Sequence, residues 1–221
     1  MDKTHTAMEC RFCSYMQNKS GPLEIDSPWA SNENFSAFVS LGALTQGWTL
    51  VLPHHHTLNM ANEYAHPDFG NFVTQVAAVV EKQYGPIAVF EHGTQAATSI
   101  TGCGTGHAHL HIVPLNFSLC EAVIQYDPDF PWIRCKVCDI ERAVAGQEYL
   151  FAADRFNGEF TEGLLCILKE PTSQFFRRVI ATRLGLPELY DYKRFQMLDI
   201  ATASYRTLKG SVSAGQLAQV A

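Results

Sequence analysis

The sequence predicts an α+β fold with a largely antiparallel sheet, and three observations lead to that class. Short apolar stretches bounded by turn residues recur along the chain, which is typical of strands. One longer stretch carries apolar residues at three- and four-residue spacing, which is typical of an amphipathic helix. The order of these elements, strands, helix, strands and then helices, favours the α+β class.

Four strands and one helix are expected in the first half. Residues 35–41 and 48–53 are short and apolar, and the turn-forming residues between them predict a hairpin. Residues 67–84 form the helical pattern, which a Gly-Pro pair ends. Residues 87–91 and 107–115 are the next two apolar stretches, and we expect a strand in each.

The second half repeats this style without repeating the sequence. Residues 148–156 and 160–169 flank Asn157-Gly158, a dipeptide that favours tight turns, and predict a second hairpin. Residues 172–185 place their apolar side chains on one face and end at a glycine, so we expect a helix there. A further helix is expected over 195–208.

We expect three segments along the chain. Residues 1–120 form a first unit, which carries the candidate site described below, residues 121–210 form an extension of a hairpin and helices packed on it, and the small residues of 211–221 form a mobile tail. A chain of 221 residues that is 47% hydrophobic can bury one generous core.

Composition narrows the partners and the compartment. The formal net charge is −6 with only 16 Lys plus Arg, which argues against a basic face that wraps a nucleic-acid polymer. No apolar run has the length of a signal peptide or of a membrane span, so we expect a cytoplasmic protein without a membrane partner. The 7 cysteines are then expected to be thiols or metal ligands.

Three histidines alternate in the stretch GHAHLHIVP, residues 106–114. If this stretch is a strand, His107, His109 and His111 share one face, with neighbours about 6.6 Å apart and the outer two about 13 Å apart. Zinc–imidazole bonds are only about 2.1 Å long, so the three rings cannot readily close on one ion. The row suits a charged, extended ligand that one ring attacks while its neighbours donate hydrogen bonds.

The loop before the histidines is a candidate phosphate site. Its glycines let backbone N–H groups approach a phosphate, and Ser99, Thr101 and Thr105 offer hydroxyl donors. Cys103 stands among them and belongs to the same candidate set. A flexible connector has a similar composition, and only the adjacent histidines favour the phosphate site.

Residues 107–113 match the His-φ-His-φ-His-φ-φ signature, where φ is hydrophobic, so the chain resembles the histidine triad (HIT) superfamily of nucleotide hydrolases and transferases. The context is similar as well, over about residues 10–116. It comprises an N-terminal CxxC, the segment WTLVLPHHHTLN, a helix and an EHG segment before the triad. The resemblance implies a HIT-like fold. Cys103 is a departure, because many members have Gln at that position.

The resemblance also implies roles for individual residues. His109 corresponds to the nucleophile that attacks the α-phosphorus and forms a transient nucleotidyl-histidine, with a main-chain carbonyl orienting its ring. His111 corresponds to a donor to the phosphate oxygens, and His107 completes the catalytic triad. Glu91 and His92, in the EHG segment, correspond to contacts with ribose or phosphate.

Zinc is the expected cofactor, in a structural site. Zinc-containing members of the family use a CxxC pair, the His of a PxxH segment and the first triad His, which are Cys10, Cys13, His56 and His107 here. Two alternatives stay open: His54 or His55 could replace His56, and Cys135 with Cys138 could complete a Cys₄ site.

The function implied is that of an enzyme, a hydrolase that cleaves a phosphoanhydride or phosphoramidate of a nucleotide, such as a dinucleoside polyphosphate, and releases a nucleoside monophosphate. Two alternatives are a nucleotidyltransferase or phosphorylase that uses the same histidine and a non-catalytic nucleotide-binding protein. A homodimer is an expected assembly. Arg177 and Arg178 are expected on the surface, and Phe12, Phe35, Phe38 and Trp29 are candidates for a nucleobase slot.

Overall fold

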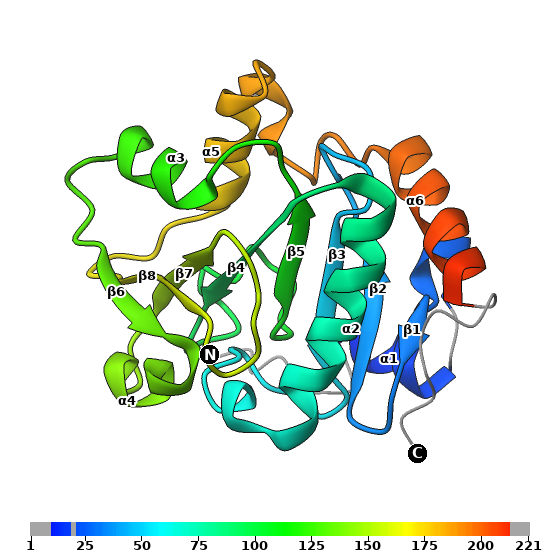
Figure 1. Ribbon diagram of the computed structural model, residues 1–221, viewed down its shortest axis with the longest axis horizontal. Helices are drawn as coiled ribbons and strands as arrows, with labels where there is room; N and C mark the ends of the chain where they lie inside the picture. The colour runs from blue at the N-terminus through cyan, green and yellow to red at the C-terminus, as the bar shows by residue number, and fades with distance from the viewer. Residues whose placement is uncertain (1–9, 19–20, 213–221) are drawn as a thin grey trace.

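The computed structural model describes residues 10–18 and 21–212, which form one eight-stranded sheet with helices on both faces (Figure 1). The strand order is β1-β2-β3-β5-β4-β7-β8-β6, and every neighbouring pair is antiparallel. The predicted α+β class with an antiparallel sheet is therefore confirmed. Each of these helices is too short or too polar to cross a bilayer.

The strands are β1 Ala30–Ser31, β2 Phe35–Val39, β3 Thr49–Pro53, β4 Ile87–Gly93, β5 Leu110–Pro114, β6 Ile133–Lys136, β7 Tyr149–Ala153 and β8 Glu162–Ile167. The α-helices are α1 Arg11–Asn18, α2 Pro67–Tyr84, α3 Leu119–Tyr126, α4 Ile140–Val144, α5 Phe175–Arg183 and α6 Leu198–Ser211. The short 3₁₀ helices are η2 Glu24–Asp26, η3 Glu63–Ala65, η4 Val137–Asp139 and η5 Pro187–Tyr190.

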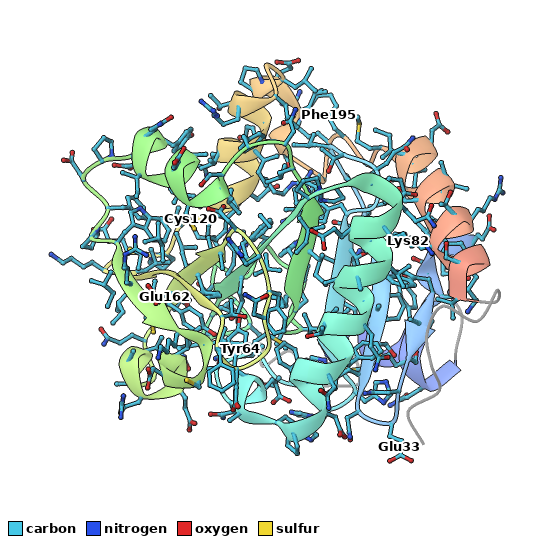
Figure 2. The ribbon with its side chains drawn as sticks, viewed as in Figure 1. Glu33, Tyr64, Lys82, Cys120, Glu162 and Phe195 are labelled. Atoms are coloured by element: carbon cyan, nitrogen blue, oxygen red, sulfur yellow. The ribbon has the colours of Figure 1, made fainter. Side chains whose placement is uncertain are left out.

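The sheet separates two apolar cores. Helices α2 and α6 pack on one face, and α1, α3 and α5 pack on the other. Because side chains alternate along a strand, Val89 of β4 belongs to the first core and its neighbour Phe90 to the second. Side chains fill the space between the sheet and the helices on both sides (Figure 2). The same alternation decides which residues reach the candidate site.

Helix α2 and the first hairpin are confirmed. The helix spans the expected residues 67–84, where the His66 side chain caps the first turn by accepting from Asp68 N and Gly85 follows with a positive φ of 88°. Strands β2 and β3 pair antiparallel, with Phe35 opposite Pro53 and Val39 opposite Thr49.

Some expected bounds are wrong. Strand β5 starts at Leu110, three residues later than expected, because Ala108 N donates to Thr57 O in the loop after β3. The second hairpin forms, but its connection covers 154–161 because Asn157 N binds the Thr161 hydroxyl and closes a wider loop. Helices α5 and α6 are also offset from the expected ranges, since α5 is shorter and α6 runs three residues further.

The second half of the chain extends the sheet of the first half. Strand β7 pairs with β4, from Val89 opposite Ala153 to Gly93 opposite Tyr149, and β8 and β6 follow. The outer edge of β4 is thus covered by strand β7 of the same chain. Of the expected tail, residues 213–221 lie outside the described residues.

Candidate active site

The three triad histidines do not form one row. His107 and His109 precede β5 and only His111 lies on it. The ring centroids of His109 and His111 are 4.6 Å apart. The His107 ring instead contacts the sulfurs of the CxxC pair. The histidines thus form two groups, His107 with the cysteines and His109 with His111.

His109 is held in one tautomer by the main chain. Its Nδ1 lies 2.8 Å from the carbonyl oxygen of His107, so Nδ1 carries the proton and donates it to that carbonyl. Removal from water lowers the pKa of His109 to about 4, against the opposing effect of this hydrogen bond. At neutral pH the ring is uncharged, and its Nε2 keeps a free lone pair.

His111 is held in the opposite tautomer. The Trp48 indole Nε1 donates to His111 Nδ1 across 2.9 Å, which leaves the His111 proton on Nε2. The ring stacks on Phe90 at 4.1 Å with an interplanar angle of 15°. Burial lowers its pKa well below the usual value. The two neighbouring rings therefore differ: His109 presents a lone pair at Nε2, and His111, also neutral, presents an N–H donor at Nε2.

A fourth imidazole, His92, lies beside these two. It is on β4, and its Nε2 accepts from the backbone N–H of Phe176 at 3.4 Å. Its ring centroid is 6.1 Å from that of His111, and burial lowers its pKa to about 3. His92 thus lines the same pocket as His109 and His111.

Glu91 does not reach the site, and the expected contact with ribose or phosphate is corrected. As the neighbour of His92 on β4 it points to the opposite face of the sheet. Its carboxylate accepts from Met60 N at 2.6 Å and from the hydroxyls of Tyr64 and Tyr149 at 2.7 Å each. Burial raises its pKa to about 7. Tyr64, labelled in Figure 2, is likewise buried.

The loop before the triad is organised by a carboxylate that the sequence did not single out. Glu148, just before β7, accepts from Thr101 Oγ1 at 2.6 Å, Ser99 Oγ at 2.9 Å and Thr94 Oγ1 at 3.0 Å. The hydroxyls of Ser99 and Thr101 are therefore engaged within the protein, and they shape the loop rather than face a ligand. Thr105 Oγ1 donates to Gly102 O at 2.9 Å.

Cys103 anchors the same loop to the second half of the chain. It adopts a positive φ of 56°, unusual for a residue with a side chain. Gln174 N donates to its sulfur at 3.3 Å, and the Tyr192 hydroxyl donates to its carbonyl at 2.7 Å. The thiol lines the same pocket as the imidazoles.

These groups surround a small pocket of about 30 Å³, adjacent to a cavity of about 150 Å³ that shares Arg11, Leu41 and Leu50 with it. The pocket is lined by Arg11, Ser40, Leu41, Leu50, His92, Gly102, Cys103, Thr105, His109, His111, Arg177 and Tyr192. Phe12 and Phe38, two of the aromatic residues expected in a base slot, line the adjacent cavity. Phe35 is core instead, packed on Phe69.

Arg177 is buried, and its expected position on the surface is wrong. Its side chain is buried, with only 4% of the residue exposed. The guanidinium lies 4.9 Å from the Trp48 ring, Nε donates to Tyr190 O at 2.7 Å, and Nη2 donates to Gly42 O. Burial lowers its pKa to about 10, so it stays charged at neutral pH. Arg178, its neighbour, is only partly buried and donates to Ser173 O.

The four expected zinc ligands lie together. The ligand atoms of Cys10, Cys13, His56 and His107 are all within 4.8 Å of one another. Three sulfur–nitrogen distances in the cluster are 3.4, 3.4 and 3.5 Å. Bonds of about 2.3 Å to sulfur and about 2.0 Å to nitrogen in a tetrahedron give an edge of about 3.5 Å. The cluster is therefore compatible with zinc.

The second nitrogen of His107 supports this use of the ring. Nε2 lies 2.9 Å from Pro53 O, so the proton sits on Nε2 and Nδ1 turns its lone pair toward the sulfurs. The alternative ligands lie elsewhere. His54 pairs with Ser36 Oγ, His55 pairs with Glu63, and Cys135 and Cys138 lie outside the cluster, on β6 and η4.

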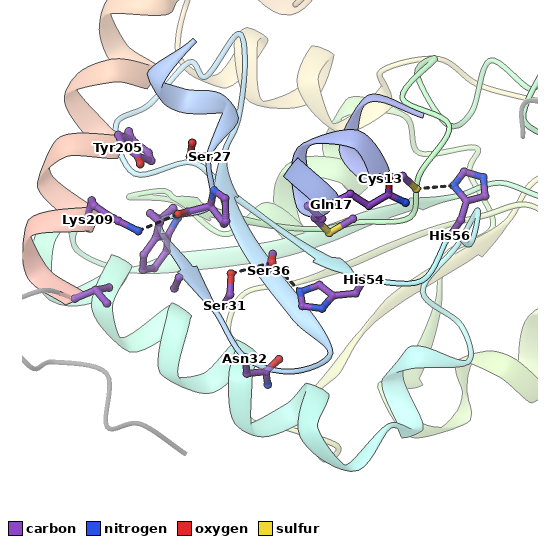
Figure 3. A pocket seen from close by; sticks show the side chains of 15 residues that line it. Cys13, Gln17, Ser27, Ser31, Asn32, Ser36, His54, His56, Tyr205 and Lys209 are labelled. Atoms are coloured by element: carbon purple, nitrogen blue, oxygen red, sulfur yellow. Dashed lines mark hydrogen bonds between the residues drawn. The ribbon is translucent and has the colours of Figure 1, made fainter. Parts of the chain in front are cut away.

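A separate groove of about 960 Å³ runs between α1, β1 and α6. Figure 3 shows Cys13 and His56 at one end of it and Tyr205 and Lys209 at the other. His109 and His111 do not line it. Trp29, the remaining candidate for the base slot, lines this groove and not the pocket that His109 and His111 line.

Comparisons with known proteins agree with the triad motif. The chain is 28% identical over 120 residues to "Protein hit" of Bacillus subtilis, a match that covers 50% of this chain and 73% of that protein. No family model matches the chain.

Several solved structures have similar parts. A hypothetical histidine triad nucleotide-binding protein from Sulfolobus tokodaii is 19% identical and covers 94% of this chain and 99% of its own, with a TM-score of 0.37. A zinc-bound histidine triad family protein from Mycobacterium smegmatis is 24% identical and covers 49% of this chain and 76% of its own, with a TM-score of 0.34. TM-scores this low support no inference about chemistry, which is drawn from the site geometry alone.

Proposed function

We propose that this chain, as a member of the histidine triad (HIT) superfamily, hydrolyses a nucleotide at its α-phosphorus through a covalent intermediate on His109. One observation carries the proposal: two adjacent imidazoles are held in opposite tautomers. His109 presents a lone pair at Nε2, and His111 presents an N–H at Nε2. A nucleophile and a hydrogen-bond donor side by side suit attack on a phosphate.

The proposed reaction has two steps. In the first, His109 Nε2 attacks the α-phosphorus, a P–N bond forms, and the bond from phosphorus to the leaving oxygen or nitrogen breaks. The leaving group departs as an anion or takes a proton from water. His111 donates to a non-bridging oxygen as negative charge develops there. In the second step water attacks the phosphorus and releases a proton to solvent, the electron pair of the breaking P–N bond returns to His109 Nε2, and the nucleoside monophosphate leaves with His109 neutral again.

The pocket supports this assignment in two further ways. The Glu148 hydrogen bonds fix the loop that carries Gly102 and Cys103, so the pocket wall is formed before any ligand binds. Arg177 provides a fixed positive charge at the same wall. A preformed, positively charged pocket favours a phosphate ligand over a neutral one.

Structural zinc at Cys10, Cys13, His56 and His107 is part of the proposal. When bound, it crosslinks the N-terminal segment to the loop that precedes β5. His107 then has two functions: its ring binds the metal through Nδ1, and its carbonyl orients His109. The ligand and the nucleophile are thus two residues apart, and the metal site fixes the backbone that aims the nucleophile.

The test compares wild type with His109→Ala on dinucleoside polyphosphates and nucleoside phosphoramidates of adenine and guanine, with release of the monophosphate as the readout. We expect wild type to release it and the variant to lose at least about 10³-fold in rate. His55→Ala is the matched control, since its side chain is 60% exposed and outside the pocket. Equal cleavage by wild type and His109→Ala would contradict the assignment.

A second readout tests the intermediate directly. Wild type quenched during turnover should carry a nucleotidyl group on the peptide that contains His109, seen by mass spectrometry as an acid-labile adduct. The far-UV circular dichroism of the variant should match wild type, so that loss of the adduct reports chemistry and not unfolding.

A further inference from the structure

Two arginines from outside the triad segment line the catalytic pocket. Arg11 is the first residue of α1 and lies between the two cysteines of the CxxC pair, and Arg177 lies on α5, in the second half of the chain. Both contribute to the small pocket that contains His92, His109 and His111. Two segments far apart in the sequence thus bring positive charge to the same pocket.

Arg177 is a buried cation without an acidic partner. Its donors bind the carbonyls of Tyr190 and Gly42, and its face lies over Trp48 and Tyr192. The ion pairs found over residues 10–18 and 21–212 do not include it. A buried charge is costly unless an opposite charge or a ligand compensates it.

A carboxylate near Arg177 is already engaged elsewhere. Asp191 Oδ1 accepts from Gln174 Nε2 at 3.2 Å and from Lys193 N at 3.0 Å. It therefore fixes the turn after η5 and does not pair with the guanidinium. Asp191 favours the charged form of Arg177 from a distance but makes no ion pair with it, so an anion bound in the pocket would add direct compensation.

Arg11 also has an unsatisfied donor. Its guanidinium lies 4.8 Å from the centre of the Phe12 ring, and its buried Nε has no hydrogen-bond partner. A buried N–H without a partner costs free energy that an acceptor from a ligand would recover. Both arginines are therefore short of an anion.

The other lining residues do not supply that anion. His92 and His111 each accept an N–H hydrogen bond at one ring nitrogen, so neither is charged. The lining residues that the structure describes include no carboxylate. The pocket therefore has two permanent positive charges and no negative charge to balance them.

From this balance we infer that Arg11 and Arg177 bind phosphate oxygens and select a nucleotide phosphoanhydride over a nucleoside phosphoramidate. The inference deepens the proposed function and rests on it. A phosphoramidate carries one negative charge at its phosphorus, whereas a phosphoanhydride carries at least two along its chain. Two arginines match the second class, because guanidinium groups bind phosphate oxygens through paired hydrogen bonds.

The inference also gives the second half of the chain a function. Arg177 is in α5, and the backbone N–H of the preceding residue, Phe176, donates to His92 Nε2 and fixes that ring. Gln174 and Tyr192 hold Cys103 in the loop beside the triad. Residues after β8 thus complete the pocket wall and decide which charge it accepts.

The test uses two substrates with the same adenylyl group, diadenosine triphosphate and adenosine 5′-phosphoramidate. We expect wild type to prefer the anhydride by at least tenfold in kcat/KM. Arg177→Gln should lower kcat/KM for the anhydride by about 10- to 100-fold and for the phosphoramidate by less than about fivefold. Arg177→Lys, which keeps the charge, should recover part of the preference. Arg183→Gln, exposed in the last turn of the same helix and absent from the pocket lining, is the matched control and should leave both values near wild type.

Two outcomes overturn the inference. One is a wild-type enzyme that prefers the phosphoramidate, and the other is an Arg177→Gln variant that loses the same factor on both substrates while its melting temperature stays at the wild-type value. If Arg177→Gln fails to fold, Arg11→Gln and Arg177→Lys give the same comparison.

A binding measurement keeps the inference separate from the proposed chemistry. Calorimetry compares AMP with adenosine 5′-(α,β-methylene)diphosphate on wild type and on Arg177→Gln. We expect wild type to bind the diphosphate analogue at least tenfold more tightly and the variant to lose that difference. If no substrate is cleaved but this difference appears, the proposed hydrolysis fails and the arginine assignment stands. Equal affinities in wild type contradict the arginine assignment.

Discussion

The Trp48 indole N–H points at Nδ1 of His111 from 2.9 Å away, and this contact decides which His111 nitrogen carries the proton. Trp48 is fully buried just before β3, and the Arg177 guanidinium lies over its ring. A residue from outside the triad motif therefore sets the hydrogen-bonding role of a triad histidine.

Replacing Trp48 by Phe should weaken catalysis without removing the nucleophile. The variant lacks the indole donor, so His111 is free to place its proton on Nδ1 and to lose its donor toward the phosphate. We expect kcat to fall by about tenfold. Nitrogen-15 NMR of the imidazoles should show the His111 tautomer shift. Trp132→Phe is the control, because the buried Trp132 N–H has no partner to lose. An unchanged tautomer in Trp48→Phe would refute this role.

Glu148→Gln should loosen the loop beside the triad. The carboxylate accepts three hydroxyl hydrogen bonds, and an amide in its place offers only one acceptor oxygen. We expect the variant to lose about 1–3 kcal/mol of unfolding free energy and to raise KM more than it lowers kcat. Urea unfolding and steady-state kinetics measure the two effects. Glu141→Gln, on the exposed side of α4, is the matched control.

The difference in unfolding free energy between wild type and Glu148→Gln should depend on pH in one direction. Burial alone would raise the pKa of Glu148, but the hydroxyls of Thr101, Ser99 and Thr94 outweigh it and the folded pKa is lowered. A lowered folded pKa stabilises the fold above the unfolded pKa, and this contribution is lost as the pH falls. The stability difference between wild type and Glu148→Gln should therefore shrink below about pH 4.5. A difference that grows on acidification would contradict the proposed hydrogen bonding.

The sequence was informative where function depends on short-range patterns. Helix α2 follows from apolar spacing within 18 residues, and the ligand cluster follows from the resemblance of Cys10, Cys13, His56 and His107 to known zinc sites. Glu148 and Arg177 were missed because their roles depend on contacts with Thr101 and Gly42, far away in the chain. No local pattern encodes such contacts.

Glu91 could have been placed correctly from the sequence. It directly precedes His92 in an expected strand, and adjacent strand residues face opposite sides of a sheet. Once His92 is assigned to the catalytic face, Glu91 belongs to the other face, with Tyr64 and Tyr149. The start of β5 could not have been placed in this way. It depends on the hydrogen bond from Ala108 N to Thr57 O, which no sequence pattern predicts.

Tyr149→Phe should destabilise the protein and leave its chemistry intact. The variant deletes one of three donors to a buried carboxylate, so Glu91 is left less well satisfied. We expect a loss of about 1–3 kcal/mol in unfolding free energy and a kcat within twofold of wild type at a temperature where both are folded. Tyr126→Phe, at the partly exposed end of α3, is the control. A large fall in kcat with unchanged stability would contradict the placement of Glu91 outside the active site.

Removing one cysteine of the metal cluster should affect both the fold and the nucleophile. In Cys13→Ser, a sulfur that lies 3.4 Å from His56 Nδ1 and 3.5 Å from His107 Nδ1 is lost, and zinc affinity should fall by at least about 100-fold. We expect zinc content measured by emission spectrometry to drop and Tm to fall by about 5 °C or more.

Activity of this variant distinguishes a metal site that aims His109 from one that only stabilises the fold. Because the His107 carbonyl orients His109, kcat should fall even at temperatures where Cys13→Ser is folded. Cys138→Ser, in the second and more exposed CxxC, should keep zinc, Tm and kcat near wild type. Full zinc content in Cys13→Ser would contradict the ligand assignment. Lost zinc with unchanged kcat would instead show that the metal stabilises the fold without orienting the nucleophile.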